Sequence, residues 1–422
     1  MELRRFWEVM VPLSGAQPAC VLPLRDEVVA VLGNRNPFWS HARRQLWIAD
    51  RGGIPVGRIA AIVDAEHQRV HGDRTGFFGY WECADDAEAA GLLLGAASDW
   101  VRSRGCDRIR GPMNPSINEE CGLLVQGHER PNAVMMPHNP AHLARCIETQ
   151  GFIKAKDLVA FDIALADSPG EKLDAFREAA ARRAPDVRLI PVTRSNLDAV
   201  LPALKEIYNV AWERNWSAVP MTGPEIDFLA QRLKPLLVKG LVWLAESRGQ
   251  PAGLLLAVPD VNEVLGSLRG HLLRPALLKA LPVLLGWRQP RCFRLIALGV
   301  TATHRRRGLE GMMFAETLAA ARRLGFSRCE ASWVLEDNPP CPPSGGAVRR
   351  THREDLSDLR QGPLIGTGTA VRFHPTLHGL HQGEQGRPDH QGPEDVDDVV
   401  VAAIDRPEAQ QKHQSGQSPS EP

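Results

Sequence analysis

One α/β pattern occurs twice along the chain, and this duplication constrains the fold more than any other feature. Residues 46–63 contain two short β-type runs joined by a glycine turn, and residues 241–258 repeat this hairpin with the same length and turn position. A strand, a helix and another strand follow each hairpin, at 76–82, 86–105 and 106–113 in the first copy and at 294–300, 308–325 and 326–335 in the second. An internal duplication of one α/β unit is the simplest explanation.

The duplication predicts two domains and a tail. A chain of 422 residues is also too long for one ordinary domain. We place the first domain at 1–165 and the second at 187–345, with a polar helical connector at 166–186. From Leu364 onward the sequence has five His and seven Gln, abundant Gly and Pro, and no sustained helical or strand period. We therefore predict that the tail at 346–422 is disordered.

The most informative segment, from Ile296 to Glu316, reads as an apolar strand, a basic glycine-containing turn and an amphipathic helix. Backbone N–H groups at the start of such a helix, together with its dipole, form a site for a pyrophosphate. Arginines add charge there, and glycines let a ligand approach the backbone. The residues concerned are Arg305, Arg306, Arg307, Gly308 and Gly311. A basic turn that caps a helix without a ligand is the alternative.

The first copy lacks this loop. Where the second copy has HRRRGLEG, the first has ECADDAE, which places Asp85 and Asp86 at the start of the helix. These carboxylates suit N-terminal caps but would repel a pyrophosphate. We therefore expect only the second domain to bind the phosphate-bearing ligand, while the first serves as a degenerate scaffold or as a wall of the site.

A locally positive stretch lies inside a neutral protein. The chain has 50 basic and 50 acidic residues, so its overall charge excludes an electrostatic footprint for nucleic acid. Between Val264 and Leu309, however, there are nine cationic residues and no acidic ones. Such a stretch suits the phosphates of coenzyme A or an anionic membrane surface.

The basic turn resembles the acyl-CoA loop of the GCN5-related N-acetyltransferase (GNAT) superfamily, whose pattern is R/Q-x-x-G-x-G/A. Arg305 and Gly308 match this pattern, whereas Glu310 occupies the last small position and Gly311 follows one residue later. Further motifs are NPFWSHARRQLWIA, VGRIAAIVDAEHQ, RGPMNPSINEECGLLVQG, MMPHNP, GFIKAKDL and EASWVLEDN. Over residues 30–338 they resemble the tandem GNAT-fold family that includes bacterial ceramide synthase.

This resemblance implies an α/β (α+β) fold of two tandem GNAT-like domains, each with a mixed central sheet flanked by helices. It implies acyl-CoA as a co-substrate, no tightly bound cofactor, and an amine acceptor. Ceramide-synthase members are implied to transfer a fatty acyl group to a sphingoid base, and paralogues to use other amines. We hypothesise an acyl-CoA-dependent N-acyltransferase with a long-chain amine acceptor. The rival hypotheses are acetyl transfer to a small amine, and acyl-CoA binding without turnover.

The chemistry implied by this family assigns provisional roles to several residues. A neutral amine attacks the thioester carbonyl, and strand N–H groups near Leu298 and Val300 polarise the oxyanion. The candidates for the base are Glu330, Glu336 and His304, and the candidate for orienting a ligand is Asn338. A polar loop expected to reach the acceptor contains Asn114, Ser116, Asn118, Glu119 and Glu120. For each of these residues a surface or purely structural role is the competing hypothesis.

The Leu-rich segment 265–287 separates the second hairpin from the loop-bearing strand. Its prolines and cations fit a lid that contacts a lipid chain or the inner-membrane surface better than a spanning helix. An amphipathic helix that covers the sheet is the alternative. The chain has no stretch of about 18 apolar residues, and its eight cysteines lack any C-x-x-C or metal-type spacing. We therefore expect a cytoplasmic protein without a metal site.

The C-terminal sequence raises the hypothesis of a frameshift. The family resemblance implies a helix and then a strand ending in a K-T-Y-R-I-Y-like run, which the chain lacks. Codons for residues 352–365 can be chosen so that reading one base later gives T-V-K-T-Y-R-I-Y-D-K-A-L and a stop. We hypothesise a single-base slip near residues 338–343, which would leave a sheet edge unpaired and impair activity. Codons across 336–366 that are incompatible with the shifted peptide would refute this hypothesis.

Overall fold

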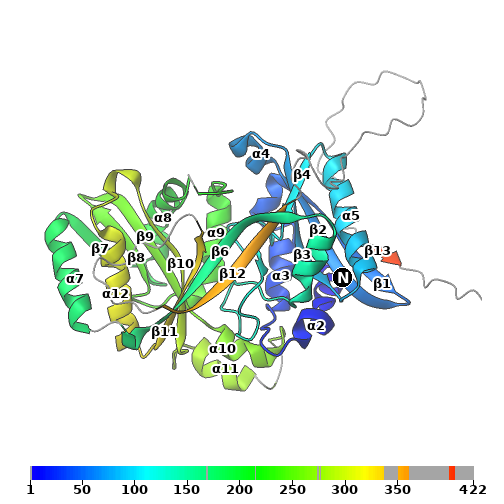
Figure 1. Ribbon diagram of the computed structural model, residues 1–422. Coiled ribbons are helices and arrows are strands. Elements are labelled where there is room, and N and C mark those ends of the chain that lie inside the picture. Colours follow the sequence, from blue (N-terminus) through cyan, green and yellow to red (C-terminus); the bar gives the residue numbers. More distant parts are fainter. Residues whose placement is uncertain are drawn as a thin grey trace, which may run out of the picture.

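The computed structural model describes residues 2–167, 170–213, 215–272, 275, 277–336, 350–360 and 399–403. It has two α/β halves that lie side by side (Figure 1). Two strands, β6 (Ile153–Ala164) and β12 (Arg350–Arg360), cross the region where the halves meet. The predicted fold class, tandem GNAT-like halves with helices packed on a mixed sheet, is confirmed by this arrangement.

The first half contains both strands of the predicted hairpin, followed by the predicted strand and helix. Its strands are β1 (Ala42–Arg51), β2 (Ile54–Asp64), β3 (Thr75–Cys83), β4 (Arg108–Gly111) and β5 (Leu123–Leu124). Its helices are α1 (Glu2–Glu8), α2 (Met10–Leu13), α3 (Arg25–Leu32), α4 (Ala65–His71), α5 (Ala87–Ser103) and α6 (His142–Thr149). The Asp86 carboxylate caps α5 by accepting hydrogen bonds from the backbone N–H groups of Glu88 and Ala89. Asp85 instead pairs with Arg145.

The second half repeats the order of hairpin, strand, helix and strand. Its strands are β7 (Val187–Pro191), β8 (Val242–Ser247), β9 (Gln250–Pro259), β10 (Cys292–Val300) and β11 (Arg328–Leu335). Its helices are α7 (Gly170–Arg183), α8 (Leu197–Ala211), α9 (Gly223–Leu233), α10 (Asn262–Leu265), α11 (Leu277–Leu284) and α12 (Leu309–Arg323). Helix α7 occupies the segment expected to connect the halves. A reciprocal capping box between Thr222 and Glu225 fixes the start of α9.

The thirteen strands of the described residues belong to one sheet, in which the two halves exchange strands. The order is β13-β1-β2-β3-β4-β12-β6-β11-β10-β9-β8-β7, with β5 paired to β12. Strand β6 follows the first half in sequence, yet it pairs antiparallel with β11 of the second half. Strand β12 comes from the C-terminus and pairs with β4 of the first half and with β6. The predicted domain boundary at residue 165 therefore separates the two halves in sequence, but the sheet is continuous across both halves.

Two strands lie in the C-terminal stretch that the composition predicts to be disordered. Strand β12 pairs with β4, β5 and β6, and β13 (Val399–Ala403) adds a parallel strand beside β1. These two segments differ from the prediction, because open sheet edges supply backbone partners and the VVVAA run favours a strand. The edge that the frameshift hypothesis leaves unpaired is occupied by β12. The rest of 346–422 lies outside the described residues, and the frameshift itself stays a prediction.

Helices cover both faces of the sheet in each half. In the first half, α5 packs on one face through Leu93 and Leu94, while α1 packs on the other through Phe6 and Trp7. In the second half, α12 and α8 bury separate apolar clusters on the strands. Among the described residues, no helix combines the length and apolar character needed to cross a bilayer.

Candidate active site

The predicted phosphate loop is a well-defined turn between β10 and α12. Thr301 Oγ1 lies 3.2 Å from Ala252 O and 2.8 Å from His304 Nδ1, and these contacts shape the short 3-10 turn Ala302–His304. Gly308 has a φ of +83° and directly precedes α12, whose start is capped by no described side chain. The first N–H groups of α12 are therefore available to an anion.

The three arginines of the loop have different surroundings. Arg305 and Arg306 are exposed, and Arg305 donates to two backbone oxygens, Val300 O at 3.4 Å and Ala211 O at 3.3 Å. Arg307 forms an ion pair with Asp186, which lies just before β7. Hydrogen bonds from Ser247 and then from Arg307 lower the pKa of Asp186 to about 2. Arg307 therefore anchors the loop, while Arg305 and Arg306 keep their charges available for a ligand.

Strand β10 leaves its neighbour β11 shortly before the loop. The parallel pairing runs from Cys292 with Arg328 to Leu295 with Ala331 and ends there, while β11 continues along β6. Beyond this point the described part of the chain pairs β10 only with β9, through Leu298 and Val300 among others. The edge of residues 296–300 that faces β11 therefore carries backbone groups without a ladder partner. This is where the sequence analysis expects N–H groups to meet an oxyanion.

The corresponding place in the first half is filled by the chain itself. Strands β3 and β4 pair in parallel only as far as Phe77 with Arg110. Beyond that pair, Met113 N donates to Phe78 O at 2.8 Å and Asn114 Oδ1 accepts from Tyr80 N at 2.5 Å. The space between β3 and β4 is therefore closed, unlike that between β10 and β11. The Asp86 carboxylate also offsets the positive dipole at the start of α5, which makes this helix start unsuitable for a pyrophosphate.

The three candidate bases lie in different environments. His304 belongs to the loop. Glu330 is 8% exposed, accepts a 2.7 Å hydrogen bond from Ser332 and stands opposite the buried Arg294 in the strand register. Glu336 is exposed just past the end of β11, with Lys154 Nζ at 3.9 Å and Lys156 Nζ at 4.0 Å. Glu330 and Glu336 are thus engaged in structural contacts, and Asn338 lies outside the described residues.

The polar loop expected to reach the acceptor splits into two groups. Asn114 uses both ends of its amide, toward Tyr80 N and toward Glu120 Oε1 at 2.6 Å, and Glu119 pairs with Arg232 at 2.5 Å. Burial raises the pKa of both glutamates. These groups hold the loop in place. Ser116 and Asn118, in contrast, line a cavity between the two halves.

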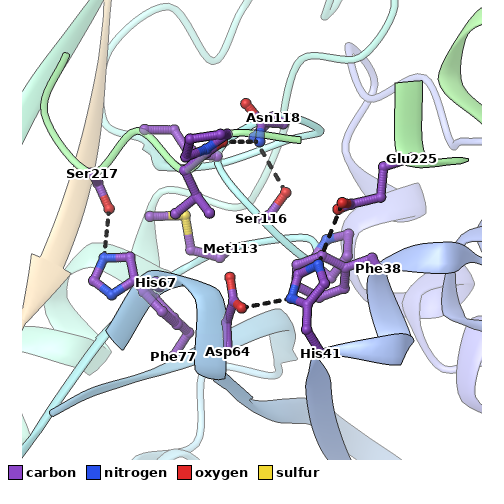
Figure 2. Close-up of a pocket in the computed structure, with 14 residues that line it drawn as sticks. Phe38, His41, Asp64, His67, Phe77, Met113, Ser116, Asn118, Ser217 and Glu225 are labelled. Carbon is purple, nitrogen blue, oxygen red and sulfur yellow. Dashed lines mark hydrogen bonds and ion pairs between the residues drawn. The ribbon is translucent and has the colours of Figure 1, made fainter. Parts of the chain in front are cut away.

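This cavity is partly open to solvent and brings together residues from several segments of both halves (Figure 2). Its lining comprises Phe38, His41, Asp64, His67, Phe77, Met113, Pro115, Ser116, Ile117, Asn118, Ser217, Val219, Pro220 and Glu225. The His41 ring lies between two carboxylates, with Nδ1 at 2.8 Å from Asp64 and Nε2 at 3.4 Å from Glu225. Asp64 and His67 fall within the VGRIAAIVDAEHQ motif and His41 within NPFWSHARRQLWIA, while Ser116 and Asn118 belong to the polar loop predicted to reach the acceptor.

The two histidines of the cavity differ in charge. Burial by itself would lower the pKa of His41, but hydrogen bonds to Asp64 and Glu225 outweigh it and raise the pKa to about 10. Burial, followed by the nearby His71, lowers the pKa of His67 to about 4. At neutral pH His41 is therefore an imidazolium and His67 is neutral.

Two α/β halves, one of which carries a strand, basic turn and helix suited to a pyrophosphate, define the class of tandem GNAT-fold proteins. A tandem GNAT protein from the clavulanic acid biosynthesis pathway matches with a TM-score of 0.51 and 12% identity, covering 86% of this chain and 96% of that one. A GCN5-related glucosamine N-acetyltransferase region of a fungal multi-domain GH3 beta-N-acetylglucosaminidase matches with a TM-score of 0.50 and 13% identity, covering 85% and 37%.

Sequence relatives identify the family within this class. The chain is 36% identical over 362 residues to bacterial ceramide synthase of Caulobacter vibrioides, covering 83% of this chain and 92% of the relative. It is 31% identical over 351 residues to Protein YghO of Escherichia coli, covering 80% and 87%. No family model matches the chain. The protein belongs to the bacterial ceramide synthase family of tandem GNAT-fold N-acyltransferases, as its motifs predict.

Proposed function

We propose that this protein transfers a fatty acyl group from acyl-CoA to the amino group of a long-chain, sphingoid-type base. The observation that carries the proposal is the turn before α12, where exposed Arg305 and Arg306 accompany a helix start without a side-chain cap. This arrangement suits the diphosphate of coenzyme A. The Caulobacter relative is named a ceramide synthase, and a ceramide is the N-acyl derivative of such a base.

The proposed reaction needs few groups from the protein. The neutral amine nitrogen attacks the thioester carbonyl carbon, and N–H groups of residues 298–300 stabilise the oxyanion. The C–S bond then breaks, the nitrogen loses a proton, and the thiolate is protonated. Among the candidate bases, His304 lies in the loop, and its Nδ1 is held by Thr301 at 2.8 Å and Thr303 at 3.0 Å. In the tautomer whose Nδ1–H donates to one of these hydroxyls, Nε2 carries the lone pair that accepts the proton.

Thiol release tests this function directly. We expect the protein to release CoA from palmitoyl-CoA when a sphingoid base is supplied, at least about tenfold faster than with acetyl-CoA or with a polar small amine. The measurement is a colorimetric thiol assay, with mass spectrometry of the N-acyl product. Faster release with acetyl-CoA and a small amine would favour the acetyltransferase hypothesis. Palmitoyl-CoA binding without release for any amine would favour a binding protein.

We also propose that the segment around α11 contacts an anionic membrane surface, from which a lipid acceptor would be drawn. Leu278, Leu285 and Trp287 are 73%, 52% and 78% exposed, and large apolar side chains rarely gather on the surface of a monomer in this way. Lys279 and Arg288 are exposed beside them. Apolar side chains flanked by cations are typical of segments that lie in a bilayer interface.

Vesicle binding tests this contact. Replacing Leu285 and Trp287 with serine is expected to lower binding to phosphatidylglycerol vesicles about tenfold, because each side chain loses apolar burial in the interface. Co-sedimentation measures the effect, with phosphatidylcholine vesicles for comparison. Ile54→Ser is the matched control, since Ile54 is 68% exposed on the opposite half of the molecule. Equal loss in the control, or no loss in the double variant, would contradict the proposal.

A further inference from the structure

The cavity of Figure 2 lies beside the helix that also contacts the phosphate loop. Asn118, in the lining, donates from Nδ2 to Val219 O at 3.1 Å and accepts from the Tyr208 hydroxyl at 3.3 Å. Tyr208 is on α8, and Ala211, at the end of the same helix, accepts from Arg305 at 3.3 Å. These contacts fall within one turn of α8. The cavity and the phosphate loop therefore flank the same end of this helix.

The cavity lining has apolar walls and an excess of negative charge. Of its fourteen residues, four are ionisable, namely His41, Asp64, His67 and Glu225. Two carboxylates against one imidazolium leave one uncompensated negative charge at neutral pH, because His67 is neutral there. Arg110 donates to Ser217 at 3.0 Å from behind the lining, and its charge interacts with that of Asp73.

Asp64 is the carboxylate that a ligand can reach. Its Oδ1 accepts from Glu66 N at 2.9 Å and contacts His41 at 2.8 Å, which leaves Oδ2 for another partner. In Figure 2 this second oxygen points away from His41 in the direction of Met113. Asp64 is only 4% exposed, so a group that reaches it is largely withdrawn from water. A charge-assisted hydrogen bond is correspondingly strong in such a place.

We propose that this cavity binds the ammonium-bearing polar head of the amine acceptor, with Asp64 as the carboxylate that receives the ammonium group. This inference rests on the proposed function and names the site for its second substrate. The hydroxyls of Ser116 and Ser217 are in the same lining and supply hydrogen bonds to hydroxyl groups of the head. Phe38, Phe77 and Ile117 offer an apolar wall to the carbons next to it.

The test measures amine binding without acyl-CoA, so that it does not depend on turnover. The probes are a water-soluble, short-chain 2-amino-1,3-diol and the matching 1,3-diol that lacks the amine, titrated by calorimetry at neutral pH. We expect the protein to bind the amine at least about tenfold more tightly than the diol. Asp64→Asn is expected to abolish this preference. Asp107→Asn is the control, because Asp107 is exposed and pairs with Arg74 elsewhere on the first half.

A second variant guards against a folding defect in Asp64→Asn, since Asp64 also caps α4 and pairs with His41. Ser116→Leu fills the cavity without removing a charge, and we expect it to weaken binding of amine and diol alike while palmitoyl-CoA binding stays unchanged. An unaltered amine preference in Asp64→Asn, an unaltered affinity for amine and diol in Ser116→Leu, or no preference in the unmodified protein would overturn the assignment of the cavity. Loss of palmitoyl-CoA binding in loop variants reports on the proposed function instead, so the two failures are distinguishable.

Discussion

Replacing Gly79 with alanine is expected to lower the free energy of unfolding by more than about 4 kcal/mol, the largest effect that we predict for any single substitution. A Cβ at this position would lie 1.6 Å from Met113 O and 2.6 Å from Met113 C, and both are backbone atoms that no rotamer change can move. Relief requires displacing residues 113 and 114, which breaks the hydrogen bonds to Phe78 and Tyr80. Urea unfolding followed by circular dichroism measures the loss.

A second glycine provides the control for this prediction. Gly95 lies inside α5, where a Cβ meets no atom within 4 Å. Gly95→Ala is therefore expected to stabilise the protein by about 0.5 to 1 kcal/mol, through the higher helix propensity of alanine. If Gly79→Ala unfolded at the same urea concentration as the unmodified protein, the segment at Met113 would not be packed between β3 and β4. The first half would then have parted strands like those of the second.

The duplication was predictable because it depends on local patterns. Each hairpin carries period-two apolar runs around a turn, and each crossover helix has its own apolar stripe. The exchange of β6 and β12 was not predictable in the same way. Each segment forms a strand, but the strand with which it pairs depends on sheet edges formed by residues far away in the sequence. The same reason explains why β12 and β13 are paired in a stretch whose composition favours disorder.

The candidate site was predictable to the extent that it is continuous in sequence. The basic turn at 305–308 is a single run, and the structure presents it at the start of α12 as expected. The sequence does not distinguish Arg307 from its neighbours, because Asp186, its partner, lies on a different segment. The cavity was missed for a related reason. His41, Asp64 and Glu225 come from three segments of the two halves, and only the closed fold brings their side chains together.

The difference between Arg307 and its neighbours leads to the second large prediction. The double variant Arg305→Ala, Arg306→Ala is expected to bind palmitoyl-CoA about a hundredfold more weakly, or about 2.7 kcal/mol, since each exposed guanidinium is available for a charge-assisted contact with phosphate. Arg307→Ala is expected to lose less than about fivefold, because that charge is already paired with Asp186. Isothermal titration calorimetry at two salt concentrations measures both affinities.

The salt dependence of palmitoyl-CoA binding tests this prediction more specifically than a loss of affinity at one salt concentration does. The unmodified protein is expected to bind palmitoyl-CoA more weakly as ionic strength rises, and the double variant is expected to show a shallower dependence, because fewer charges then contact the phosphates. Arg104→Ala is a suitable control, since its guanidinium stacks on Trp100 at 4.0 Å from the ring centre in the first half. If the double variant kept the affinity and the salt dependence of the unmodified protein, the diphosphate would bind elsewhere. The turn before α12 would then be a helix start without a ligand, and the similarity to N-acyltransferases would lie in the fold alone.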